Sequence, residues 1–144
     1  MDPINILLIE DNEGDIILTT EALTQGKIIN NIAVIKNGKK AIDFLEKKYP
    51  FEKALQPDLI LLDINLPKMN GHEVLQNIKT NQLLKHIPVI ILTSSSSDKD
   101  ILMAYQHFAN YYLTKPLDAD DYLKVVSSIE TFWINHIQLP LKTL

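Results

Sequence analysis

The sequence predicts a doubly wound α/β domain, in which five parallel strands form one sheet with helices on both faces. Short apolar runs rich in β-branched residues alternate along the chain with segments of helical periodicity. Strands that are each followed by a helix run parallel and are joined by right-handed crossovers. The 144 residues show no repeat and no change of composition, which fits a single domain.

Five segments have strand character. The first, third and fourth are apolar almost throughout, as expected for parallel strands that are buried on both faces. We therefore place these three strands at the centre of the sheet. The predicted strands are residues 5–10, 31–35, 58–63, 88–93 and 110–114.

Helical periodicity lies between and after these strands. The predicted helices are residues 15–25, 39–48, 72–80, 98–108 and 119–136, and a hydrophilic surface loop is predicted over residues 47–56. The last helix is unusually long. It carries an apolar stripe at three- and four-residue steps, formed by Tyr122, Val126, Ile129, Trp133 and Ile137.

The composition predicts a soluble cytoplasmic protein. The lack of cysteine excludes a disulfide framework and suits a reducing compartment. A formal charge of −4, with no cluster of basic residues along the sequence, argues against nucleic-acid binding. No apolar run is long enough to span a membrane, and the amino terminus lacks the basic start of a secretion signal.

Polar residues gather where the predicted strands end. Glu10 and Asp11 follow the first strand, Asp63 ends the third, Thr93 ends the fourth and Lys115 follows the fifth. In an open α/β sheet, ligands bind outside the carboxyl ends of the strands, so these side chains are expected to share one pocket. Three carboxylates repel one another unless a cation relieves them, and oxygen ligands favour Mg²⁺ over zinc.

This set of groups indicates phosphoryl transfer onto a carboxylate. Lys115 offers a point charge and Thr93 a hydroxyl donor for phosphoryl oxygens, which leaves Asp63 as the candidate nucleophile. Each residue alone also fits a helix cap or a turn, and only their conjunction at one edge points to chemistry. Asp15 and Asp98 are interpreted as acids at helix starts. The four histidines are interpreted as surface or partner-facing residues, because they show no spacing typical of metal ligands.

The motifs at these strand ends resemble the receiver domain of two-component response regulators. They are "ED" at Glu10, "DINLPKMNG" from Asp63, "TS" at Thr93 and "KP" at Lys115, in the order of that family and over nearly the whole chain. The resemblance implies that Asp63 accepts a phosphoryl group from the phosphohistidine of a sensor kinase. It also implies a flavodoxin-like sheet of strand order 2-1-3-4-5.

The same resemblance assigns further roles. Asp11, Asp63 and the backbone carbonyl of Asn65 would hold Mg²⁺, with Glu10 assisting through water, and Thr93 and Lys115 would contact the phosphoryl oxygens. The Lys115–Pro116 bond would be cis, and Tyr112 would be the aromatic switch residue that responds to Thr93. The departures from the family pattern are Glu10 in place of the commoner aspartate and Asn70 where an aspartate often precedes the glycine.

A narrower resemblance joins the chain to stand-alone receivers associated with bacterial phytochromes. It rests on "IEDNEGD", the long insert before the third strand and "IETFWINHIQLP". Residues 1–144 are then one receiver domain with an extended C-terminal helix, a short tail and no output domain, since residues 137–144 are too few for a DNA-binding module. Such a protein is a phosphoacceptor and not an enzyme, apart from its own phosphorylation and dephosphorylation. Its signal leaves through protein contact or a phosphorelay.

Two other classes remain open on the residues. A phosphatase of the haloacid dehalogenase type also uses an aspartyl nucleophile, but it needs a second acid two residues later, where this chain has Asn65. A flavodoxin-like binding module shares the sheet, but its first loop must accept phosphate, whereas "EDNEGD" is acidic. Neither class explains Lys115 and Pro116 as well as the receiver does.

The late part of the last helix is the candidate interaction surface. Phe132 and Trp133 come where the body of the domain should already end, which leaves apolar surface without an internal partner. Aromatic residues are favoured at interface cores, and twofold dimers are the commonest oligomers. We expect this surface to form a homodimer or to contact the kinase.

Overall fold

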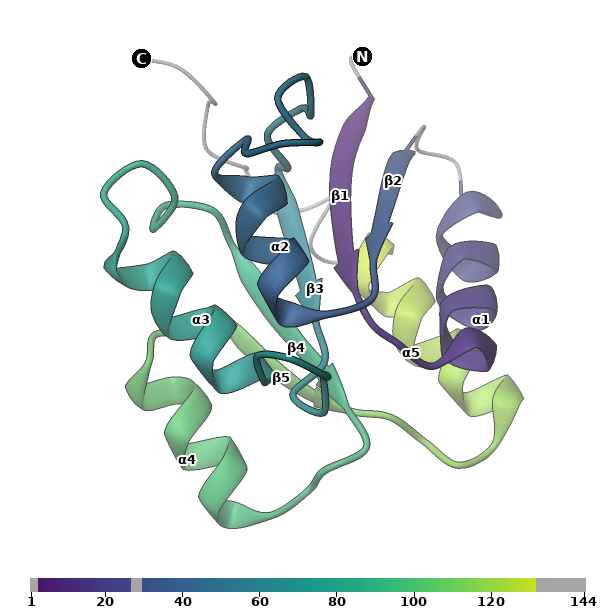
Figure 1. Cartoon of the computed structure of the whole chain (residues 1–144). Coiled ribbons are helices and arrows are strands. Elements are labelled where there is room, and N and C mark those ends of the chain that lie inside the picture. Colours follow the sequence, from purple (N-terminus) through teal and green to yellow (C-terminus); the bar gives the residue numbers. More distant parts are fainter. Residues whose placement is uncertain (1–2, 27–29, 132–144) are drawn as a thin grey trace.

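The computed structural model describes residues 3–26 and 30–131, which form one five-stranded sheet of parallel strands (Figure 1). The strand order is β2-β1-β3-β4-β5, as the family resemblance implied. The strands are β1 (Ile4–Ile9), β2 (Asn30–Ile35), β3 (Leu59–Leu62), β4 (Val89–Thr93) and β5 (Tyr111–Thr114). The predicted doubly wound α/β class is confirmed.

The three apolar strands β1, β3 and β4 occupy the centre of the sheet, as predicted. Every residue of β3 and β4 is buried, whereas β2 and β5 at the two edges are partly exposed. Burial on both faces explains why the central strands show no alternation of polar and apolar residues. Because all five strands are parallel, their carboxyl ends meet at one edge of the sheet.

In the part of the chain that the structure describes, five helices cover the two faces of the sheet. They are α1 (Glu13–Thr24), α2 (Gly38–Leu45), α3 (Gly71–Thr80), α4 (Asp98–Gln106) and α5 (Ala119–Ile129). Helices α1 and α5 lie together on one face, and α2, α3 and α4 lie on the other (Figure 1). Each face has its own cluster of buried apolar side chains. A buried hydrogen bond of 2.9 Å between the hydroxyls of Thr19 and Tyr122 joins α1 to α5.

Each helix begins at a residue whose side chain accepts a backbone N–H three positions later. This N-cap satisfies one of the backbone donors that a helix leaves free in its first turn. The capping residues are Asn12, Asn37, Asn70, Ser97 and Asp118. Asn70, a departure from the family pattern, therefore has a structural role at the start of α3.

The insert over residues 47–56 is an irregular loop, as predicted, and it is attached to α2 through the rings of Phe51 and Phe44, whose centroids are 5.4 Å apart. The last helix was predicted to reach residue 136, but residues 132–136 lie outside the part of the chain that the structure describes. Phe132 and Trp133 belong to this segment. In the described part of the chain, no helix has both the length and the apolar character needed to cross a bilayer.

Candidate functional site

The carboxyl edge of the sheet brings the predicted site residues together. Glu10, Asp63, Thr93 and Lys115 each follow or end a different strand, and each is at most 9% exposed. Asp11 lies beside them on the surface. Burial of so many ionisable groups is costly unless they are paired, so their contacts decide what the site can do.

Lys115 is the centre of the site, because its ammonium contacts three carboxylates. Its Nζ lies 2.8 Å from Asp63 Oδ2 and 2.9 Å from Asp15 Oδ2, and it also donates to Glu10 Oε1. The ammonium thus supplies the positive charge that these buried acids need. It also bridges β5, β3, the end of β1 and the first turn of α1 with one side chain.

Asp15 is the site residue that the sequence interpretation missed. It does lie in the first turn of α1, where its N–H donates to Asn12 Oδ1 at 2.9 Å, but its carboxylate also points to Lys115. A sequence signal existed, because α1 starts directly after β1. The first turn of a helix that follows a strand so closely stays at the carboxyl edge of the sheet.

The pKa values of the two buried acids, Glu10 and Asp63, are shifted in opposite directions. Burial raises the pKa of Glu10 to about 7, although its contact with Lys115 acts in the opposite direction. Burial would also raise the pKa of Asp63, but hydrogen bonds from Lys115, Glu10 and Thr93 outweigh it and hold that pKa below its usual range. Asp63 is therefore an ionised carboxylate at neutral pH, which is the state that a nucleophile requires.

Contacts with the same acids protect the charge of Lys115. Burial alone would lower its pKa, but the hydrogen bonds to Asp15, Asp63 and Glu10 raise it above the usual value. The lysine is therefore a permanent cation at this site. It can stabilise negative charge and cannot act as a base.

Three carboxylates at this edge can hold a divalent cation. Glu10, Asp11 and Asp63 each offer one oxygen, and these atoms lie within 4.8 Å of one another. A set of oxygen ligands with an exposed member fits a hard ion that keeps part of its water shell. The N–H of Asn65 donates to Asp63 Oδ1 at 3.1 Å, which fixes the loop beside the cluster.

The predicted switch residues lie next to this cluster. Thr93 is fully buried, and its hydroxyl helps to hold the Asp63 carboxylate ionised. Tyr112 is partly buried and packs on the core beneath α2, α3 and α4, and its hydroxyl donates to Ser95 O at 2.8 Å. Its neighbour Tyr111 is 45% exposed, so the structure distinguishes two tyrosines that are nearly equivalent in the sequence.

One sequence prediction at this edge is wrong. Among the described residues, the cis peptide bond is Tyr49–Pro50, and Lys115–Pro116 is not cis. The trans form of an X–Pro bond is favoured in general by about 0.5–1 kcal/mol, in agreement with the bond seen here. With the trans bond, the Lys115 ammonium still reaches all three acids.

Comparison with known proteins agrees with this geometry. Residues 6–127 match the family model of the response regulator receiver domain. The response regulator Rcp1 of Synechocystis is 42% identical over 135 residues, which cover 94% of this chain and 92% of that protein. The probable methanogenesis regulatory protein FilR2 of Methanothrix harundinacea is 39% identical over 96% of this chain and 89% of its own.

Two solved structures of similar proteins are a metal-bound and a phosphorylated response regulator. The Mn²⁺-bound form of Rcp1 has a TM-score of 0.94 and 41% identity, over 96% of this chain and all of that one. The phosphorylated cyanobacterial phytochrome response regulator RcpA has a TM-score of 0.95 and 38% identity, over 97% of this chain and all of that one. These matches favour a receiver over the phosphatase and the flavodoxin-like module. With this fold, this acidic edge and these relatives, the chain belongs to the receiver-domain family of response regulators, the signalling proteins of two-component systems.

Proposed function

We propose that Asp63 accepts a phosphoryl group from the phosphohistidine of a sensor kinase. The observation that supports this most directly is a buried carboxylate at the end of β3 whose pKa is held low by a lysine. A buried carboxylate that merely stabilised the fold would need no acidic neighbours. Asp63 instead shares its pocket with Glu10 and Asp11, which suits a site that must receive a cation.

The transfer is a displacement at phosphorus. An Asp63 oxygen attacks the phosphorus atom and the bond from phosphorus to the imidazole nitrogen breaks. That nitrogen keeps the electron pair and takes up a proton from water, so the histidine leaves as neutral imidazole. Asp63 Oδ1 accepts the Asn65 N–H, and Oδ2 accepts the Lys115 ammonium. After the transfer, the Lys115 ammonium donates to a phosphoryl oxygen instead of the Asp63 carboxylate, and the Thr93 hydroxyl donates to another phosphoryl oxygen.

We infer that the cation is Mg²⁺, held by Asp11, Asp63 and the carbonyl of Asn65, with Glu10 beside them. When bound, it neutralises the charge that builds up on the transferring phosphoryl group. Its oxygen-ligand preference and the exposure of Asp11 to water support this choice. A later attack of water on the phosphoryl group would return Asp63 to its carboxylate, so self-phosphorylation and self-dephosphorylation are the only chemistry proposed.

We also infer that the partner kinase is of the phytochrome class, because the similar structures include phytochrome and bacteriophytochrome response regulators. In this proposal, phosphorylation draws the Thr93 hydroxyl inward and Tyr112 follows, which changes the face formed by α4, β5 and α5. Residues 1–144 act as one cytoplasmic receiver domain that signals by protein contact or phosphorelay. Dimerisation through Phe132 and Trp133 and the lack of nucleic-acid binding remain predictions.

The test is Asp63→Asn, which keeps the shape of the side chain and removes the nucleophilic charge. Incubation with acetyl phosphate and Mg²⁺, followed by intact-mass measurement, should add one acid-labile phosphoryl group to the wild-type chain and none to the variant. Asp98→Asn, at an exposed acid in the first turn of α4, is the control and should be labelled like wild type. Labelling of Asp63→Asn would show that another residue is the acceptor, and steady phosphate release without labelling would favour the phosphatase.

A further inference from the structure

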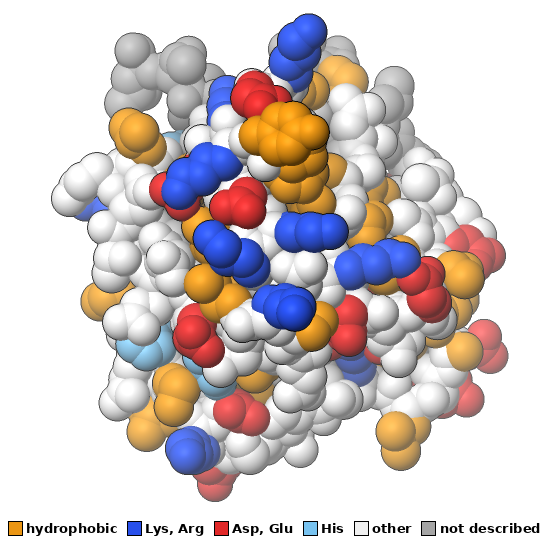
Figure 2. All heavy atoms as spheres, in the orientation of Figure 1, with side chains coloured by type: hydrophobic (Ala, Val, Ile, Leu, Met, Phe, Trp, Pro, Cys, Tyr) orange, Lys and Arg blue, Asp and Glu red, His pale blue; other side chains and the backbone are white. Residues whose placement is uncertain are grey.

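A cluster of lysines covers α2 and the segments beside it. Five of these lysines lie within residues 39–53 and the sixth lies in the loop after β3, and Figure 2 shows lysines on this face among hydrophobic and acidic side chains. We call this surface the α2 lysine face. It comprises the exposed residues Lys39, Lys40, Lys47, Lys48, Lys53 and Lys68.

The α2 lysine face is positively charged on a chain whose net charge is −4. Lys39 forms an ion pair with Asp43 at 3.7 Å, and Lys48 forms one with Glu46 at the same distance. Within the described residues, the other four lysines of the face have no carboxylate within 4.0 Å, since the ion pairs found there involve none of them. A positive face on an acidic molecule steers an acidic partner to that face and repels it from the rest of the surface.

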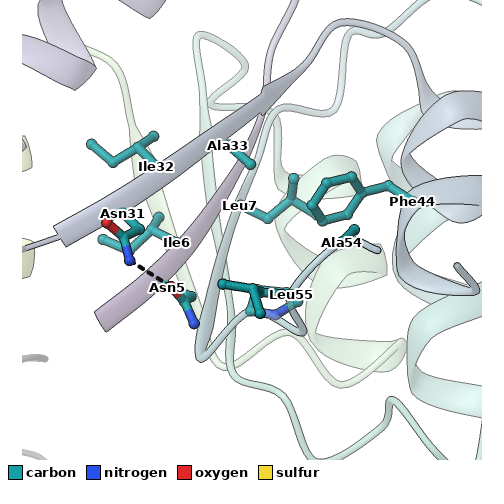
Figure 3. Close-up of a pocket in the computed structure, with 10 residues that line it drawn as sticks. Asn5, Ile6, Leu7, Asn31, Ile32, Ala33, Phe44, Ala54 and Leu55 are labelled. Carbon is teal, nitrogen blue, oxygen red and sulfur yellow. Dashed lines mark hydrogen bonds between the residues drawn. The ribbon is translucent and has the colours of Figure 1, made fainter. Parts of the chain in front are cut away.

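An apolar hollow opens beside the lysines. It has a volume of about 240 Å³ and lies between the strands β1 and β2, α2 and the 47–56 loop. Figure 3 shows the ring of Phe44 pointing from α2 toward Leu7, with Ala33, Ala54 and Leu55 around the same space. Leu55 is 64% exposed, so this apolar lining is open to solvent. The volume is below the roughly 300–1,000 Å³ of small-molecule sites and suits an inserted side chain better.

Charged and apolar features thus adjoin one another. Lys40 lies one helical turn before Phe44, and Lys53 immediately precedes Ala54 of the lining. Interfaces commonly place an apolar anchor in a pocket and surround it with a polar rim. The rim here consists of lysines, and the chain contains no arginine. The rim therefore lacks the bidentate donors that favour phosphate groups.

We propose that the α2 lysine face binds an acidic segment of another protein, whose apolar side chain enters the hollow beside Phe44. The acids of the segment pair with the lysines, and the apolar side chain covers Leu7, Ala33 and Leu55. The hollow lies at the amino-terminal halves of β1 and β2, away from Asp63 at the carboxyl edge and from the face of α4, β5 and α5, whereas Lys68 lies in the loop that follows Asp63. Binding in the hollow is therefore expected with or without the proposed phosphorylation.

The probe is a synthetic, dye-labelled peptide with one leucine at the centre of a run of aspartates and glutamates. Titration into the full chain, read by fluorescence anisotropy and by amide NMR shifts, should give saturable binding with shifts around Ala33, Ala54 and Leu55. Peptides with the leucine changed to serine, or with the acids changed to amides, should bind more weakly. Affinity should fall as salt is raised, because exposed charge pairs are screened.

Two double variants and two single variants locate the binding. Lys40→Gln combined with Lys47→Gln should weaken the peptide roughly two- to twentyfold, as expected for the loss of two exposed charge pairs. The matched control, Lys99→Gln combined with Lys124→Gln, removes two exposed lysines from α4 and α5 and should leave the affinity unchanged. Ala54→Phe should fill the hollow and block binding. Because this larger side chain could also disturb the loop, Leu55→Ser is a second test and should weaken binding by removing apolar contact. All variants should still take up a phosphoryl group.

The proposal fails if the peptide does not saturate, if its shifts lie away from the hollow, or if the two double variants weaken it equally. It also fails if vesicles with about one-fifth phosphatidylserine or a single-stranded oligonucleotide bind this face while the peptide does not. Self-association that is lost only in Lys40→Gln with Lys47→Gln would assign the face to a second copy of the chain and overturn the proposal.

Discussion

Burial raises the pKa of the Glu10 carboxyl to about 7, even though Lys115 contacts it. A proton on Glu10 must leave before this residue can help to hold a cation, so cation binding releases a proton when the pH is below that pKa. The observed Mg²⁺ affinity should therefore fall about tenfold for each pH unit below about 7 and level off above it. Calorimetric titration with Mg²⁺ from about pH 5.5 to 8 checks this slope, and Glu10→Gln should remove it. A slope that persisted in Glu10→Gln would place the titration on another residue.

Asp15 determines where Lys115 can go when a cation arrives. It contacts the ammonium but does not belong to the acidic cluster of Glu10, Asp11 and Asp63. A bound cation would repel the Lys115 ammonium, and Asp15 would still offer the ammonium a contact beside the site. In Asp15→Asn, the lysine stays longer on Asp63, and Mg²⁺ affinity should fall about fivefold, the effect of one partly exposed ion pair.

A double-mutant cycle tests whether Asp15 acts through the lysine. Asp15→Asn made in a Lys115→Met background should change Mg²⁺ affinity less than about twofold, because the competing ammonium is gone. Calorimetry on the four proteins gives the coupling. An equal loss in both backgrounds would mean that Asp15 attracts the cation directly, and the interpretation through Lys115 would be wrong.

Gly71, at the start of α3, shows how an element is fitted to the site. Its N–H donates to Ile64 O at 2.8 Å, and a Cβ at this position would come within 2.3 Å of the Asp63 carbonyl oxygen. Gly71→Ala therefore has to push α3 away from the end of β3. We expect a loss of about 1–3 kcal/mol in the free energy of unfolding, measured by urea denaturation.

Gly14→Ala is the matched control for Gly71→Ala. A Cβ at Gly14 would meet only the Asn12 side chain, at 3.4 Å, which is ordinary contact. Alanine also favours a helix over glycine by roughly 1 kcal/mol, so the control should be neutral or stabilising. Equal stability changes in the two variants would show that backbone propensity, and not close contact, explains the glycine at position 71.

Helices and strands could be predicted where a short stretch of the sequence is enough to identify them. The apolar runs of β3 and β4 are visible in a short stretch of sequence, so the order of strands and helices was predicted correctly. Strand order came from the family resemblance, because no local signal states which strands pair. The contact of Asp15 with Lys115 joins residues that are distant in the sequence, so the sequence interpretation missed it. It missed the α2 lysine face for another reason: five of the six lysines lie within residues 39–53, but the sequence alone does not show that they share one exposed face.

Across the molecule, one hydrogen-bond network ties three elements to the site. His72 of α3 lies 3.0 Å from an oxygen of Asp100 in α4, and the Ser95 hydroxyl donates to the other oxygen of that carboxylate. Tyr112 of β5 donates to the carbonyl of Ser95, two residues after Thr93. The network therefore holds the β4–α4 loop and α4 in one arrangement, with Tyr112 turned toward the loop.

This arrangement is expected to be one of two between which phosphorylation shifts the population. Tyr112→Phe removes a hydrogen bond of 2.8 Å to Ser95 O and so destabilises the arrangement seen here by about 1 kcal/mol. Because the coupling is reciprocal, the variant should bind the phosphoryl mimic beryllofluoride about fivefold more tightly in the presence of Mg²⁺. Tyr105→Phe, at an exposed tyrosine of α4, is the control and should bind it like wild type. Titration of the two variants beside wild type decides the matter, since unchanged or weaker binding to Tyr112→Phe would exclude the Ser95 contact as part of the switch.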